Sequence, residues 1–308
     1  MSERVIITGA SGFIGKALCR YLYENGYVVI ALSRNPSKSG KSLGKYVKVV
    51  GWNGKSSNEW AHYLDGSYGI INLAGENIGT GRWNYNKKRL ILESRLDAGN
   101  AVIDAIGKVN NKPKVLIQAS AIGYYDLHSD EIFDESSKNG KDFLSDVCRQ
   151  WEISTKEAES FGVRHIVVRS GIVLGQNGGV FPRLFLQFRM FLGGYFGSGK
   201  RWLSWIHIND EIRAIKFLLE KELSGIFNLT ALEPIIIKDF CHILGNLTKR
   251  PPWLSLPSSP VRLFFGEKGE EILLSSQRVV PKRLLENGFN FLYPDVESAL
   301  KEIINVKN

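Results

Sequence analysis

The sequence predicts an α/β fold, a doubly wound parallel sheet with a smaller C-terminal lobe, and the start of the chain carries that prediction. A β-branched run at residues 5–7 ends in a glycine turn, as a buried parallel strand commonly does. Residues 12–25 then repeat apolar side chains on one helical face, and residues 27–32 form a second apolar run. Together they make a strand–helix–strand unit of about 30 residues, the size of a nucleotide-binding half-fold.

The same alternation continues along the chain, which is why we expect helices on both faces of the sheet. Further strands are predicted at 47–50, 69–74, 114–119, 164–169 and 225–229, and further helices at 86–107, 143–161 and 209–220.

The composition changes after Gly171. Residues 175–204 are rich in glycine and aromatic side chains, and residues 231–308 carry several prolines and short helical stretches. We therefore expect residues 1–230 to form a Rossmann domain, to which residues 171–204 add part of a substrate lobe. Residues 231–308 are expected to form a C-terminal lobe.

Charge and cysteine content narrow the class of partner. The 308 residues carry a formal charge of +9, but the basic residues are scattered, whereas nucleic-acid binding usually needs a concentrated patch. Positive charge also suits a small anionic ligand. The three cysteines lie far apart in the sequence, which argues against a disulfide framework and fits a reducing compartment. No apolar run approaches the ~18 residues of a membrane span. We expect a small-molecule substrate and no nucleic-acid or membrane partner, in the cytoplasm or an organelle stroma. A homodimer stays open.

The turn after the first strand has the residues of a diphosphate-binding loop. Its three glycines lie three residues apart. The first permits a tight turn, the second lets the backbone approach a pyrophosphate, and the third lets helix and strand pack closely. The helix that follows offers free N–H groups and a positive dipole end to the phosphates. A plain strand–helix turn is the alternative. The residues expected to contact a dinucleotide are Thr8, Gly9, Ser11, Gly12, Phe13, Ile14 and Gly15.

The end of the second strand indicates which dinucleotide is bound. A carboxylate there would bond the ribose hydroxyls of NAD, but the sequence has Ser33 and Arg34 and no acidic residue. A guanidinium can pair with a 2′-phosphate through two hydrogen bonds. We therefore expect NADP(H) as the cofactor, held in part by Ser33 and Arg34. The alternative for Arg34 is a solvated loop side chain.

The glycine loop, together with Asn72, Leu73, Ala74 and Gly75 after the fourth strand, resembles the extended short-chain dehydrogenase/reductases and sugar-nucleotide epimerases. More narrowly, the chain resembles a branch named "epimerase family protein", in some genomes "cell division inhibitor". Segments that carry this resemblance include Ser94-Arg95, residues 120–125 and 204–207, and a tail with Gln277-Arg278-Val279-Val280-Pro281. The resemblance implies the fold, NADP(H) binding and cofactor contacts at residues 72–75.

The acid/base pair usual in that superfamily is absent. Its members use a Tyr-x-x-x-Lys pair, in which the lysine lowers the tyrosine pKa, and a serine after the fifth strand. Ser120 lies where that serine belongs, and the resemblance also assigns it to the cofactor edge. None of the eleven tyrosines has a lysine four residues later. Cys148 and Glu152 occupy the two positions instead, and a thiol beside a carboxylate should have a raised pKa. Cys148 is then most simply a small packing residue.

Two tyrosines near Ser120 are the remaining catalytic candidates. Tyr124 and Tyr125 follow the fifth strand at the edge where ligands bind in such sheets. Either hydroxyl could serve a substrate, or the rings could simply line the pocket. We therefore expect an NADP(H)-dependent oxidoreductase or epimerase-like enzyme acting on a small carbonyl, hydroxyl or nucleotide-sugar-like compound. A catalytically weak NADPH-binding regulatory protein is the alternative. No metal-ligand spacing is found, so no metal is expected.

Overall fold

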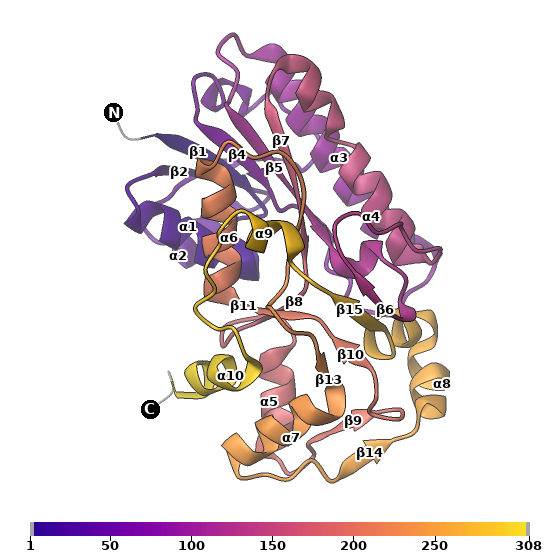
Figure 1. Cartoon of the computed structure of the whole chain (residues 1–308). Coiled ribbons are helices and arrows are strands. Elements are labelled where there is room, and N and C mark those ends of the chain that lie inside the picture. The colour runs from indigo at the N-terminus through magenta and orange to yellow at the C-terminus, as the bar shows by residue number, and fades with distance from the viewer. Residues whose placement is uncertain (1–2, 306–308) are drawn as a thin grey trace.

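The computed structural model describes residues 3–305 and is centred on a seven-stranded parallel sheet (Figure 1). Its strands are β1 (Arg4–Thr8), β2 (Val28–Ser33), β3 (Lys48–Gly51), β4 (Gly69–Asn72), β5 (Val115–Ala121), β7 (Arg164–Ser170) and β12 (Gly225–Leu229), in the order β12-β7-β5-β4-β1-β2-β3. The order in which strands are added to the sheet reverses at β1: β2 and β3 lie on one side of it, and β4 and the later strands lie on the other. Such a switch point opens a ligand crevice at the carboxyl ends of the strands.

Helices cover both faces of the sheet because alternate strand residues point to opposite faces. On one face, α1 and α6 pack with Val5 and Ile7 in one core; on the other, α3 packs with Ile6 and Ile70 in a second core. Figure 1 shows these two layers on either side of the strands, which confirms the predicted fold class. The helices are α1 (Phe13–Glu24), α2 (Pro36–Leu43), α3 (Tyr85–Lys108), α4 (Phe143–Ile153) and α6 (Ile208–Glu220).

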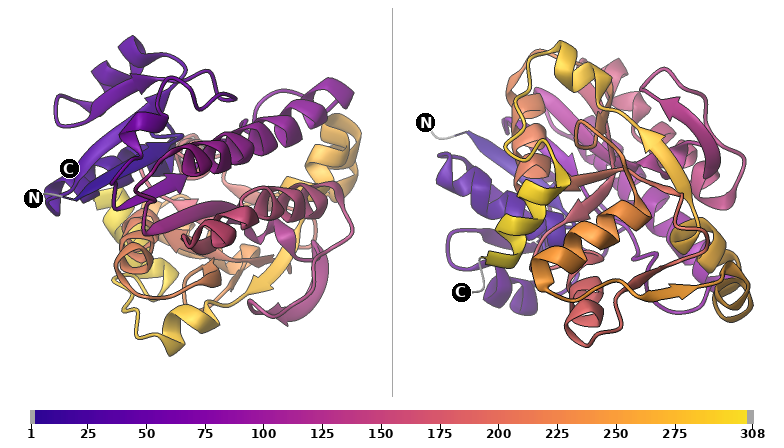
Figure 2. Two further views of the ribbon diagram at one scale, coloured as in Figure 1. Left: turned by 90° about the horizontal axis from the view of Figure 1, so that it is seen from above. Right: turned by 60° about the horizontal axis from the view of Figure 1, so that its bottom comes forward.

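The lobe is built from two stretches of chain that interleave. Three strands of the tail pair with strands of the first 230 residues: β13 with β10, β14 with β9, and β15 with β6. Figure 2 shows these tail segments running along the lobe and back to the sheet. The elements concerned are β6 (His128–Phe133), β8 (Ile172–Leu174), α5 (Phe181–Arg189), β9 (Gly194–Phe196), β10 (Trp202–Leu203), β11 (Trp205–His207), β13 (Ile235–Ile236), α7 (Ile237–Thr248), β14 (Leu254–Leu256), α8 (Ser258–Lys268), β15 (Ser276–Val279), α9 (Lys282–Glu286) and α10 (Val296–Asn305).

One predicted helix is shorter than expected. The helix expected at residues 143–161 ends as α4 at Ile153, and a 3-10 helix follows at Lys156–Phe161. Between them, the Ser154 hydroxyl donates to the carbonyl of Trp151 at 2.7 Å, and the Thr155 hydroxyl bonds His165 at 3.0 Å. Hydroxyl side chains that bond locally compete with helix continuation.

Glu211, in the first turn of α6, is a buried carboxyl group. It is 1% exposed; its Oε1 accepts a hydrogen bond from the Ser170 hydroxyl at 2.6 Å, and its Oε2 has no partner among the residues described. Burial raises the pKa of Glu211 to about 8, against the opposing effect of the Ser170 bond. The group is therefore neutral in the folded protein at pH 7, but ionised in the unfolded chain, where its pKa is about 4.3.

We expect Glu211→Gln to remove a pH dependence of stability. Between the unfolded and folded pKa values the wild type releases a proton on unfolding, so its free energy of unfolding falls as pH rises. From pH 6 to pH 7 the free energy of unfolding of the wild type should fall by up to about 1.4 kcal/mol more than that of the glutamine variant, whose side chain stays neutral. Urea unfolding of both proteins at pH 6 and pH 7 measures this effect. If the free energies of the two proteins differ by the same amount at both pH values, Glu211 is not neutral in the folded protein.

Candidate functional site

The loop between β1 and α1 leaves a backbone surface open at the carboxyl edge of the sheet. Gly9 has a φ of +65°, and a Cβ there would lie 2.6 Å from the carbonyl oxygen of Leu73. A Cβ on Gly15 would lie 2.4 Å from the carbonyl oxygen of Gly9. Helix α1 follows Gly12, with no side-chain cap and no acidic residue in its first turn. Its N-terminal N–H groups and positive dipole end are therefore available to an anion.

Gly9→Ala should destabilise the fold by about 1–3 kcal/mol, because the new methyl group meets backbone atoms in a left-handed conformation. Gly26→Ala is the matched control: its φ is +87°, but a Cβ there would meet nothing within 4 Å. Urea unfolding of both variants separates the conformational effect from the steric one. Equal losses of free energy would mean that the close approach to Leu73 is not the constraint.

Buried polar side chains tie together the strand ends that surround this loop. The Thr8 hydroxyl donates to Oδ1 of Asn72 at 2.6 Å and accepts from the backbone N–H of Ala74 at 3.1 Å. The Asn72 amide in turn donates to Gln118 at 2.8 Å. These bonds join β1, β4 and β5, so Thr8 and Asn72 position the predicted contact segment 72–75 beside the glycine loop. Gln118 is a site residue that the sequence analysis missed.

The end of β2 separates Ser33 from Arg34. Ser33 is buried, and its hydroxyl bonds that of Ser39 at 2.6 Å and accepts from the backbone N–H of Asn35 at 3.1 Å. Arg34 is exposed, and its side chain makes no hydrogen bond or ion pair with the residues that the structure describes. The Ser33 hydroxyl thus shapes the turn, while the Arg34 guanidinium is free to meet a ligand.

Ser120 lies at the centre of a buried ionic cluster. Its hydroxyl donates to Oε1 of Glu152 at 2.7 Å. Arg169 holds both oxygens of Glu152 through Nε and Nη2, each at 2.8 Å, and is only 1% exposed. Burial by itself lowers the pKa of Arg169, but its bonds to Glu152 raise it above its ordinary value. The guanidinium therefore stays charged and neutralises the Glu152 carboxylate.

Cys148 and Glu152, one turn apart on α4, both lie beside Ser120. Burial, and then the nearby Glu152 carboxylate, raise the pKa of the Cys148 thiol to about 12, while Arg95 and Ser120 oppose this rise. The thiol is neutral at pH 7, so it does not reproduce an acid/base tyrosine. The predicted upward shift is confirmed.

The two candidate tyrosines differ in exposure. Tyr125 is fully buried, its hydroxyl donates to Asn228 at 2.7 Å and accepts from Arg169 at 3.0 Å, and burial raises its pKa to about 12. Tyr124 is half-buried, with the Arg169 guanidinium carbon 3.3 Å from its ring centroid. Its hydroxyl makes no hydrogen bond to the residues described here. Of the pair, only Tyr124 keeps its hydroxyl available to a substrate.

Arg95 adds a cation that the sequence analysis quoted but did not assign to the site. From α3 it reaches the carbonyls of Ile91 at 2.7 Å and Glu76 at 3.2 Å, and its guanidinium carbon lies 4.7 Å from the centroid of the Trp151 ring. Burial lowers the pKa of Arg95, whereas Cys148 and Glu76 raise it. No carboxylate within residues 3–305 hydrogen-bonds its guanidinium, and the carboxylate of nearby Glu76 pairs with Lys87 at 2.6 Å.

Other polar residues near the crevice hold the lobe in place. Lys88 pairs with Glu267 of α8 at 2.7 Å. His207 accepts from the backbone N–H of Asn209 at 3.1 Å and bonds Glu302 of α10 at 2.9 Å. His207 thus caps α6.

Neither metal ligation nor membrane spanning is indicated within residues 3–305. Across these residues, no group of three or more His, Cys, Asp or Glu side chains is placed to hold a metal ion. No helix in the same range is long and apolar enough to cross a bilayer.

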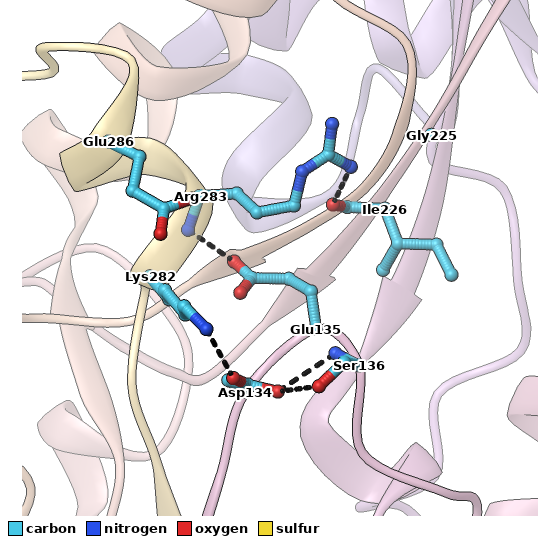
Figure 3. Close-up of a pocket in the computed structure, with 8 residues that line it drawn as sticks. All are labelled: Asp134, Glu135, Ser136, Gly225, Ile226, Lys282, Arg283 and Glu286. Carbon is cyan, nitrogen blue, oxygen red and sulfur yellow. Dashed lines mark hydrogen bonds and ion pairs between the residues drawn. The ribbon is translucent and has the colours of Figure 1, made fainter.

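A cavity of about 420 Å³ lies apart from this centre, at the outer edge of β12 (Figure 3). Glu135 there accepts from the backbone N–H of Asn228 at 3.0 Å and that of Arg283 at 3.2 Å. The Arg283 guanidinium donates to the carbonyl of Ile226 at 2.7 Å. These bonds satisfy outward-facing backbone groups of an edge strand, which protects the edge from pairing with other chains.

The family of the chain follows from sequence comparison. Residues 5–230 match the NAD dependent epimerase/dehydratase family, and residues 256–303 match a domain of unknown function, DUF1731. The chain is 37% identical over 303 residues to the chloroplastic epimerase family protein SDR39U1 homolog of Arabidopsis thaliana, covering 97% of this chain and 86% of the relative. It is 35% identical over 302 residues to epimerase family protein YfhF of Bacillus subtilis, covering 97% of each.

Solved structures resemble the chain over its whole length. A crystal structure of human epimerase family protein SDR39U1 (isoform 2) with NADPH has a TM-score of 0.88 at 33% identity, covering 98% of this chain and 99% of that one. UDP-glucose 4-epimerase of Thermotoga maritima, at 16% identity, has a TM-score of 0.81, covers 98% of this chain and 97% of its own, and shares the fold. Together with the glycine loop and the switch point at β1, these matches place the chain in the NAD dependent epimerase/dehydratase family.

Proposed function

We propose that this chain binds NADP(H) at the carboxyl edge of its sheet and reduces a small carbonyl compound. The observation that carries the proposal is the pairing of an uncapped α1 N-terminus with a free Arg34 at the end of β2, where no carboxylate is present. The related human protein was crystallised with NADPH. The donor set suits that group: backbone N–H groups for a diphosphate and a guanidinium for a 2′-phosphate.

Each part of the cofactor has a matching surface. The diphosphate would rest on the backbone of residues 9–15, and segment 72–75 would line its ribose side. The 2′-phosphate would meet Arg34, and the nicotinamide would extend toward Ser120. When bound, NADPH supplies the hydride that a carbonyl carbon accepts.

The residues around Ser120 favour negative charge on the substrate oxygen. Glu152 is neutralised by Arg169, whereas Arg95 has no carboxylate partner among the residues described. The excess positive charge stabilises a developing alkoxide and suits an anionic substrate. The Ser120 hydroxyl points its proton at Glu152, so it offers its lone pairs to a donor. Tyr124 is the available hydroxyl for delivering a proton.

A second candidate is an NADPH-binding regulatory protein. The observation that favours it is the Cys148–Glu152 arrangement, because a neutral buried thiol cannot replace the acid of the usual pair. A protein that only binds the cofactor needs no proton donor beside the nicotinamide. Sugar-nucleotide epimerisation also needs an acid/base group beside the nicotinamide, and that role would again fall to Tyr124.

One experiment separates the two. Purified protein is mixed with NADPH and a panel of aldehydes, ketones and quinones, and the absorbance of the reduced ring is followed. Turnover that falls at least tenfold in Tyr124→Phe and in Ser120→Ala, with NADPH affinity kept, supports the reductase. Tight NADPH binding without turnover on every compound supports the regulatory protein.

We place the protein in the cytoplasm or an organelle stroma. Its three cysteines are unpaired and buried, which suits a reducing compartment. One relative is named chloroplastic.

A further inference from the structure

The end of the lobe farthest from the sheet exposes a cluster of large apolar side chains. At the end of α5, Met190, Phe191 and Leu192 are 60%, 52% and 48% exposed, and Trp253, just before β14, is 64% exposed. The Trp253 indole N–H donates to the carbonyl of Phe191 at 2.7 Å, so the two segments form one surface. Figure 1 shows α5, β9 and β14 together at this end of the molecule. We name these four residues and Leu186, which is 55% exposed, the distal patch.

Unpaired cations surround the distal patch. The Arg250 guanidinium carbon lies 4.1 Å from the centroid of the Phe191 ring, Lys249 precedes it, and Arg189 precedes Met190. None of these three cations pairs with a carboxylate within residues 3–305. Residues 181–199 and 240–257, which include α5, β9 and β14, contain no aspartate or glutamate. The surface is therefore apolar at its centre and cationic at its margin.

The backbone at the centre of the patch is held in an unusual conformation. Phe191 has a φ of +59°, in the left-handed region that a bulky side chain rarely adopts. Two hydrogen bonds hold it there. The Phe191 N–H donates to the carbonyl of Phe188 at 3.0 Å, and the Phe191 carbonyl accepts from the Trp253 indole N–H. Phe191 follows the C-cap residue of α5, so its left-handed conformation ends the helix, and the Leu192 N–H bonds the carbonyl of Gln187 at 2.9 Å.

We propose that the distal patch docks the protein on an anionic lipid surface. Aromatic and aliphatic side chains enter the headgroup region, and neighbouring lysines and arginines meet the phosphates. The proposal departs from the sequence-based expectation of no membrane partner, which rested on the lack of a spanning segment, because adsorption of this kind needs no spanning helix. A second copy of the chain fits less well, because a two-fold contact through this patch would set its cations against the same cations. The patch contains no residue of the cofactor edge, so the proposal stands apart from NADP(H) binding.

The test is co-sedimentation of the full chain with phosphatidylcholine vesicles, with and without phosphatidylglycerol, at low and high salt. We expect binding only to the vesicles that contain phosphatidylglycerol, and its loss at high salt. Each cation near such a surface contributes about fivefold in affinity, equivalent to about 1 kcal/mol. Arg189→Gln/Lys249→Gln/Arg250→Gln should therefore weaken binding on the order of 100-fold. Met190→Ser/Leu192→Ser should weaken it at least about tenfold.

Matched variants on other surfaces control for net charge and apolar area. Lys41→Gln/Lys45→Gln/Lys221→Gln removes three exposed cations elsewhere, and Leu285→Ser/Leu292→Ser removes two exposed leucines. Both should bind vesicles within about twofold of wild type, and every variant should keep its melting temperature. Equal losses in patch and control variants would overturn the proposal, as would absence of vesicle binding at low salt. A wild-type dimer that the Met190/Leu192 variant abolishes, without vesicle binding, would assign the patch to a second copy.

Discussion

Arg34→Ala should weaken NADPH binding about 10- to 100-fold and leave NADH binding almost unchanged. A charge-assisted hydrogen bond to a phosphate contributes about 1.5–3 kcal/mol, and 1.4 kcal/mol corresponds to a factor of ten in affinity. The side chain is exposed and makes no hydrogen bond or ion pair within residues 3–305, so its removal should leave the fold intact. Calorimetric titration of both dinucleotides measures the ratio directly.

Two further variants sharpen this test. Arg34→Lys keeps the charge but loses the fork that bonds a phosphate twice, so its NADPH affinity should be intermediate. Lys45→Ala removes an exposed cation after α2 and should change neither affinity. Equal weakening of NADPH and NADH by Arg34→Ala would show that the guanidinium contacts something other than the 2′-phosphate.

The sheet and its cofactor loop were readable from the sequence because their signals are local. The strand predicted at residues 225–229 coincides with β12 (Gly225–Leu229), and the helix predicted at 86–107 differs from α3 (Tyr85–Lys108) by one residue at each end. The strand is a short apolar run that begins at a glycine, and the helix has an asparagine, Asn84, as its N-cap. The lobe gave no such signal: β13 has two residues and β14 three, and their partners lie more than 30 residues away in the chain.

The candidate site around Ser120 could be predicted only in part from the sequence, for the same reason. Ser120 and the replacement of the tyrosine and lysine by Cys148 and Glu152 follow from motif spacing. The partner of Glu152 does not, because Arg169 lies 17 residues away near the end of β7, a strand that also carries Arg164 and His165. A fully buried arginine such as Arg169 requires a nearby anion, but the sequence does not say which carboxylate supplies it.

That ion pair leads to the largest stability effect we expect. Arg169→Met should lower the free energy of unfolding by about 3–5 kcal/mol, since it leaves the Glu152 carboxylate, 11% exposed, without a counter-charge. It also removes the hydrogen bond to the Tyr125 hydroxyl. Urea unfolding gives the loss. It should be measured without cofactor, because a bound dinucleotide adds its own stabilisation.

A double-mutant cycle tests the cause. Glu152→Leu alone strands the Arg169 charge and should be similarly destabilising, whereas Glu152→Leu/Arg169→Met removes both charges and should recover much of the loss. The double variant also releases Ser120 from its acceptor, so its hydroxyl becomes free to donate to a substrate oxygen. If the two single losses simply add, Arg169 does not hold Glu152 in place, and the orientation of Ser120 cannot be attributed to their pairing.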